Sequence, residues 1–213
     1  MNETLNSNKL WNTSEEHHIV LNKHFCFIQI PKTSSSNMMQ NCIEKGLITM
    51  LPCYRHEGLL FIEKYIDDSN FPIYTIVRNP FCQIHSYFFH RIKHNEIKID
   101  KNLSIVANFE NFCRNTFNDV HLQQYNYIRS NKNLKVKFFK LEEGVDKLNN
   151  HILKTHNIDL QLQKTHHNAN EIKDKTKVDL QSFFANKEII DLIIQARRKE
   201  FELFNYPTNI NSI

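Results

Sequence analysis

The sequence contains very little glycine: its 213 residues include only Gly46, Gly58 and Gly144. A phosphate loop of the nucleoside triphosphatase type needs several glycines followed by Gly-Lys and a Ser or Thr. No such run occurs here, so the scarcity of glycine excludes that loop. The sequence also lacks a second metal-binding carboxylate motif. Without that motif and without the glycine-lysine loop, a small-molecule kinase that uses ATP is disfavoured.

Long apolar runs and paired cysteine motifs are absent as well. Nothing approaches the ~18 apolar residues of a membrane span, and the first 18 residues are too polar for a signal peptide. We therefore expect a cytoplasmic protein with no membrane span. The 5 cysteines form no C-x-x-C pair, which favours reduced thiols, and the 12 histidines show no metal-ligand spacing, so we expect no metal site.

The length and the hydrophobic content of the chain suit one domain with a substantial core. The chain is 40% hydrophobic and carries 27 basic against 23 acidic residues, a net charge of +4. This mild surplus does not indicate a nucleic-acid partner, but it can be concentrated in one anion-binding cleft. We expect a polar, poorly ordered tail over residues 1–20, a single domain over 21–207 and a short tail over 208–213.

The first informative stretch is a strand, a polar loop and a helix in succession. Residues 25–30 have the aromatic and branched content of a buried strand, and Pro31 ends it. Lys32 and four hydroxyl residues, 33–36, precede a predicted helix over 37–45. A helix N-terminus beside a lysine suits a phosphate or sulfate group. The same residues could instead simply cap a turn.

The second stretch repeats this order. Residues 73–77 predict a strand that leads into Arg78, and Pro80 opens a predicted helix over 81–93 that carries Ser86. Arginine binds phosphate through two N–H groups, and a hydroxyl adds a donor. A pairing of Arg78 with a carboxylate is the alternative. The repetition predicts an α/β fold with a central parallel sheet flanked by helices.

Other segments complete the predicted sheet and its covering helices. Further strands are expected over residues 47–53 and 134–139. Helices are expected over 58–66, 109–117, 120–128, 148–153 and 188–204. The last of these is the most clearly amphipathic, with apolar residues at helical spacing.

Together these motifs resemble the PAPS-dependent sulfotransferases, most closely the carbohydrate branch that acts on heparan and chondroitin. Ile30-Pro-Lys-Thr-Ser-Ser-Ser resembles that family's 5′-phosphosulfate loop, and Val77-Arg-Asn-Pro with Ser86 resembles its 3′-phosphate motif. Lys140-Leu-Glu-Glu and the closing Glu200-Phe-Glu-Leu-Phe-Asn-Tyr-Pro extend the likeness, which covers roughly residues 24–207.

The resemblance implies a P-loop-NTPase-like sulfotransferase fold and a function. The expected activity moves a sulfuryl group from 3′-phosphoadenosine 5′-phosphosulfate to a hydroxyl, on a glycan acceptor, without a metal. It leaves adenosine 3′,5′-bisphosphate as product. The cofactor-binding residues expected on this basis are Lys32, Thr33, Ser34, Ser35, Ser36, Asn37, Arg78 and Ser86.

One departure separates the chain from the family. Ser34 and Ser35 stand where the family usually has Gly-Gly. A serine held in the left-handed region costs on the order of 1–2 kcal/mol. The substitution keeps open a second interpretation, a catalytically inactive relative that binds a nucleotide or glycan without transferring anything.

Two residues are expected to carry the chemistry. Lys32 would stabilise the charge on the leaving phosphate, and His56 would take the proton of the acceptor hydroxyl. The resemblance supports His56, which lies close to the position of a catalytic histidine in heparan 2-O-type enzymes. Glu57 and Glu63 are the alternative bases, and His85 ranks lower. Basic residues that could meet an anionic glycan are Arg55, Lys93, Lys98 and Lys101, and the resemblance adds an acceptor-side segment over 123–125.

Overall fold

A five-stranded sheet organises the chain, in the order β3-β1-β2-β4-β5. The computed structural model describes residues 18–50, 56–162 and 178–212. Its strands are β1 (His18–Leu21), β2 (Cys26–Ile28), β3 (Thr49–Met50), β4 (Ile73–Val77) and β5 (Val136–Lys140). Strands β2, β4 and β5 run parallel, with Phe27 opposite Tyr74 and Thr75 opposite Phe138. The prediction of an α/β fold is confirmed, and the parallel pairing holds for these three strands.

The other edge of the sheet is antiparallel, which the sequence did not predict. Strand β1 pairs antiparallel with both β2 and β3. Residues 18–20 therefore belong to the sheet, and their assignment to a polar tail was wrong. Two antiparallel pairings in succession give β3 the same direction as β2. Strand β3 consequently ends at the same edge of the sheet as β2 and β4.

Alternate residues of the central strands pack against two separate cores. Cys26 and Ile28 of β2 face the core that contains Leu59, Phe81 and the C-terminal helix. Phe25, Phe27 and Tyr74 face the core that contains Met38 and Leu148. Buried on both faces, β2 and β4 read as continuous apolar runs, which explains why the sequence revealed them.

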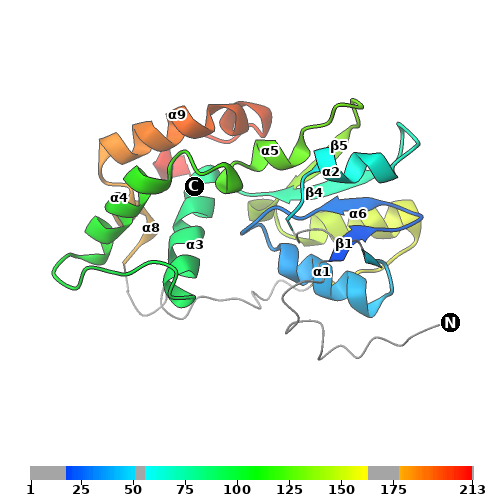
Figure 1. Cartoon of the computed structure of the whole chain (residues 1–213), viewed down its shortest axis with the longest axis horizontal. Helices are drawn as coiled ribbons and strands as arrows, with labels where there is room; N and C mark the ends of the chain where they lie inside the picture. Colours follow the sequence, from blue (N-terminus) through cyan, green and yellow to red (C-terminus); the bar gives the residue numbers. More distant parts are fainter. Residues whose placement is uncertain (1–17, 51–55, 163–177, 213) are drawn as a thin grey trace.

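The helices cover both faces of the sheet (Figure 1). Helices α1 (Ser35–Glu44) and α6 (Asp146–His156) pack on one face. The other core takes α2 (Leu59–Ile62), α3 (Pro80–Lys93), α4 (Ile105–Thr116), α5 (Gln124–Ile128), α8 (Leu180–Phe183) and α9 (Lys187–Leu203). Single-turn 3₁₀ segments lie at Glu63–Tyr65, Val120–Leu122, Leu141–Glu143 and Ile210–Ser212. Each predicted helix has a counterpart, while α8 was not predicted.

The structure also bears on the state of the cysteines and on membrane-spanning helices. Among the described cysteines, Cys26, Cys42 and Cys113 are buried free thiols, and burial raises the pKa of Cys26 to about 12. In the described part of the chain, no helix is both long and apolar enough to cross a membrane.

Candidate functional site

The loop between β2 and α1 has an unusual backbone. Lys32 and Ser34 both adopt positive φ angles, 65° and 67°. Ser34 is the N-cap of α1, and Ser35 begins the helix with ordinary backbone angles. The left-handed serine expected where the family has glycine is therefore present at Ser34 and absent at Ser35.

Several polar groups of this loop are used within the protein. The Thr33 hydroxyl is fully buried and donates to the Ile30 carbonyl at 2.9 Å. The backbone N–H of Asn37 donates to the Ser34 carbonyl at 3.1 Å, and its side chain accepts from Asn41 at 2.9 Å. These contacts shape the loop. Ser34 and Ser36 are half-buried, whereas Ser35 is buried.

Arg78 links the two predicted anion-binding stretches. Its side chain extends from the end of β4, and Nη1 donates to the Lys32 carbonyl at 3.2 Å. Gln124 holds its main chain on both sides: the Arg78 N–H donates to Oε1 at 2.8 Å, and Nε2 donates to the Arg78 carbonyl at 2.6 Å. The two stretches, 46 residues apart in sequence, therefore meet at one edge of the sheet.

The loop that carries Lys32 also contacts α3, the helix that carries Ser86, because Gln83 of α3 donates to the Pro31 carbonyl. The pKa of His90 is lowered to about 4, first by the burial of its ring and then by the positive charges around that ring, of which Lys32 contributes most. Ser86 is half-buried and lies one turn before His90, on the same face of α3. Lys32, Arg78 and Ser86 belong to three different segments of the chain, and Arg78 contacts the Lys32 carbonyl. His90, which is neutral at pH 7, was not among the predicted site residues.

His56 lies at the same edge. Its Nδ1 is 2.8 Å from the carbonyl oxygen of Gln29, the residue that directly follows β2. A carbonyl can only accept, so Nδ1 carries the proton and the neutral ring keeps its lone pair on Nε2. That tautomer suits a general base. Arg55, the preceding residue, lies outside the described residues.

The competing bases are placed differently. Glu63 is 6% exposed and accepts hydrogen bonds from the Ser130 hydroxyl and the N–H groups of Asn131 and Lys132. These donors, Ser130 above all, lower the pKa of Glu63, so it serves the turn at 130–132 and is a poor base. His85 is buried against aromatic rings, with the Phe183 ring 4.6 Å away. Glu57 is half-buried and remains an alternative.

A buried polar cluster lies behind the site. Gln83 of α3 donates to the Pro31 carbonyl at 2.9 Å and accepts from Arg197 of α9 at 2.5 Å. Arg197 also pairs with Glu200 at 2.5 Å, and Glu200 accepts from Gln124 at 3.2 Å. Sequence reasoning missed this cluster. A signal existed, because Arg197 and Glu200 continue the apolar stripe of α9 as two opposite charges.

The remaining segments that carry the family resemblance converge on Glu142. Its carboxylate accepts from the Asn79 N–H and from the Tyr206 hydroxyl, both at 2.8 Å. Burial and the neighbouring Glu142 charge raise the pKa of Tyr206, so this hydroxyl remains a donor. Lys140 donates to the Asn205 carbonyl at 2.8 Å. Glu142 thus fastens the strand ends to the C-terminal segment.

A polar pocket of about 620 Å³ lies between α5 and α9. Its lining includes Gln123, Tyr125 and Asn126, the ion pair of Arg197 and Glu200, and three further cationic residues, Arg129, Arg198 and Lys199. Within the described residues, none of these three cations pairs with a carboxylate. Gln124 does not line it, since it is fully buried against Arg78.

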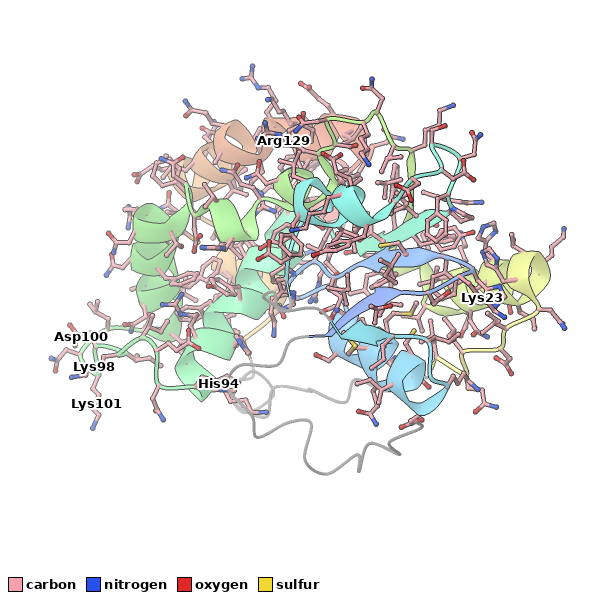
Figure 2. The ribbon with its side chains drawn as sticks, turned by 45° about the vertical axis from the view of Figure 1, so that its right-hand side comes forward. Lys23, His94, Lys98, Asp100, Lys101 and Arg129 are labelled. Carbon is pink, nitrogen blue, oxygen red and sulfur yellow. The ribbon has the colours of Figure 1, made fainter. Side chains whose placement is uncertain are left out.

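The basic lip expected from Lys98 and Lys101 is not part of this arrangement. Both side chains are exposed in the loop after α3, at the end of that helix remote from Arg78. Figure 2 shows them together at one end of the molecule, far from Arg129.

Comparison with known proteins gives no match to a family model, a curated protein or a solved structure. In the described ranges, no group of three or more His, Cys, Asp or Glu side chains is arranged to hold a metal ion.

The left-handed serine leads to a first prediction. Ser34→Gly should raise the free energy of unfolding by about 0.5–1 kcal/mol, because it removes a backbone cost of about 1–2 kcal/mol while freeing the unfolded chain. Ser35→Gly is the matched control, and should lower stability by about 0.5–1 kcal/mol because Ser35 is helical. Urea denaturation measures both. A loss of stability in Ser34→Gly would contradict the positive φ angle at this position.

Proposed function

We propose that the chain is a PAPS-dependent sulfotransferase that transfers a sulfuryl group to a hydroxyl of a carbohydrate, with a P-loop-NTPase-like sulfotransferase fold. The observation that carries the proposal is the contact between Arg78 and the Lys32 carbonyl. It brings a lysine-bearing helix N-terminus and a strand-end arginine to one place. A ligand with two separated anionic groups, such as adenosine 3′,5′-bisphosphate, fits that pairing.

Some of these residues would bind the nucleotide, and others would take part in the transfer step. Arg78 keeps N–H groups beyond the one bonded to Lys32, and with Ser86 it would hold the 3′-phosphate. Lys32 and the start of α1 would hold the 5′-phosphosulfate. As the bond from sulfur to the phosphate oxygen breaks, Lys32 stabilises the negative charge left on that oxygen. His56 Nε2 takes the proton from the acceptor hydroxyl while its oxygen bonds to sulfur.

The pocket between α5 and α9 is our candidate for the acceptor site. Gly58, two residues after His56, packs against α5, one of the two helices that line the pocket: a Cβ added at Gly58 would be 3.2 Å from the Tyr127 Cα. The pocket lining holds Gln123 and Tyr125 of the predicted acceptor-side segment. The cations Arg129, Arg198 and Lys199 suit a glycan that carries negative charge.

A catalytically inactive relative is the second candidate function, and Ser34 is the observation that favours it. The family's glycine permits the left-handed backbone without cost, whereas Ser34 adopts it at φ 67°. Such a protein would bind the bisphosphate with the same residues but transfer no sulfuryl group.

Nucleotide binding tests the site. Adenosine 3′,5′-bisphosphate should bind without magnesium and more tightly than AMP or ATP, by calorimetry. Arg78→Ala should weaken the bisphosphate by about 1.5–3 kcal/mol, the scale of a hydrogen bond to a charged group. AMP should be affected less, because it lacks the 3′-phosphate. Arg114→Ala, a surface arginine of α4, is the control. Equal affinity of the wild type for the bisphosphate and AMP would remove the assignment of Arg78 and Ser86.

A further inference from the structure

We propose that the buried ion pair of Arg197 and Glu200 sets the spacing between the two phosphate subsites, and so determines selectivity for a 3′,5′-bisphosphate. The inference rests on the proposed function. Both residues act through others and do not touch the nucleotide, so they are positioning residues. Two fully buried glutamines connect the pair to the two sides of the site.

The first connection runs through Gln83 to the 5′ side. Its Nε2 donates to the Pro31 carbonyl, and its Oε1 accepts from Arg197 Nη2. A carbonyl only accepts and a guanidinium only donates, so one amide orientation satisfies both partners. The residue before Lys32 is therefore connected to α9 through one side chain of α3.

The second connection runs through Gln124 to the 3′ side. Its Oε1 accepts the Arg78 N–H, while Nε2 donates to the Arg78 carbonyl and to Glu200 Oε2 at 3.2 Å. These bonds fix the main chain from which the Arg78 guanidinium extends. The position of that guanidinium therefore depends on where Glu200 holds Gln124.

The junction of the two connections is buried and charged. Arg197 Nη2 lies 2.5 Å from Glu200 Oε2, and both side chains are 2% exposed. Helix α9 departs from helical geometry at Arg197, with φ −113° and ψ 16°. A buried ion pair adds little net stability compared with apolar residues of similar size. Its distinctive effect is to orient the two glutamine amides, because the Arg197 guanidinium only donates to Gln83 and the Glu200 carboxylate only accepts from Gln124.

Three variants separate the two connections from the junction. Gln83→Met and Gln124→Met each remove one connection without leaving a charge unpaired. The double variant Arg197→Met/Glu200→Met removes the junction and both charges together. Arg114→Met/Glu188→Met, which removes an exposed ion pair between α4 and α9, is the matched control. Calorimetry on each protein gives the affinities for AMP, adenosine 3′,5′-bisphosphate and adenosine 2′,5′-bisphosphate.

The expected pattern differs between the glutamines. Gln124→Met should lower the preference for the 3′,5′- over the 2′,5′-bisphosphate by about three- to tenfold, with AMP affinity nearly unchanged. Gln83→Met should weaken all three nucleotides by a similar factor, since all carry the 5′-phosphate. The double variant should show both effects, and the control neither.

Each possible result either supports or overturns the inference. A folded double variant with the wild-type preference overturns the inference. If the double variant fails to fold, the two glutamine variants decide, and an identical pattern in both overturns the inference. A wild type that does not prefer the bisphosphate over AMP refutes the proposed function itself, and the inference falls with it.

Discussion

Replacing His56 by alanine is expected to slow sulfuryl transfer by about two to four orders of magnitude, with affinity for adenosine 3′,5′-bisphosphate unchanged. The hydrogen bond from Nδ1 to Gln29 leaves the lone pair on Nε2, and removing a general base costs about that factor. Single-turnover transfer from PAPS measures the rate of the chemical step.

Three controls separate a base from a structural histidine. His56→Asn keeps an N–H that can donate to the Gln29 carbonyl but cannot take a proton, so it should be as slow as the alanine variant. Added imidazole should restore part of the rate of His56→Ala. His24→Ala, between β1 and β2, should transfer at the wild-type rate. Near-normal transfer by His56→Asn would give the role to Glu57.

Replacing Lys32 by alanine is expected to lower turnover by about 10²- to 10³-fold, and to weaken bisphosphate binding far less. Its charge is needed most when negative charge develops on the leaving phosphate, so its loss raises the barrier more than it weakens the ground state. Turnover and affinity, measured on the same preparation, provide the comparison.

A change in backbone conformation does not complicate the comparison of Lys32→Ala with the wild type. Lysine and alanine are both non-glycine residues, so each has a similar cost at the φ angle of 65° that position 32 adopts. Lys45→Ala, at the exposed end of α1, is the control for a lost charge. If Lys32→Ala loses affinity and turnover is unchanged at saturation, Lys32 is a positioning residue only.

The sequence predicted those parts of the fold whose signals are local. Strand β4 was predicted with its observed bounds, because five consecutive buried residues require branched and aromatic side chains. The proline that opens α3 is likewise a local signal, whereas its N-cap, Asn79, which accepts the Phe81 N–H at 2.9 Å, was not predicted. Strand β1 was missed because it has four residues and follows a polar segment. Its antiparallel direction depends on pairing across the sheet.

The site was predictable to a similar extent. The motifs around Lys32 and Arg78 indicated two anion-binding elements, and parallel strand ends indicated a common edge. The contacts that hold them depend on distant residues: Gln83 and Pro31 are 52 positions apart, and Arg197 and Gln83 are 114 apart. Gln124 was expected on the acceptor side, whereas tertiary packing buries it against Arg78.

The most direct test of the central claim is sulfuryl transfer by the wild-type chain. PAPS labelled in its sulfur is incubated with the protein and a panel of neutral and acidic glycans, without metal. The account predicts labelled glycan together with an equal amount of adenosine 3′,5′-bisphosphate, and neither product above background with His56→Ala. Tight bisphosphate binding without labelled product on any hydroxyl acceptor would contradict the account, and would identify an inactive nucleotide-binding relative.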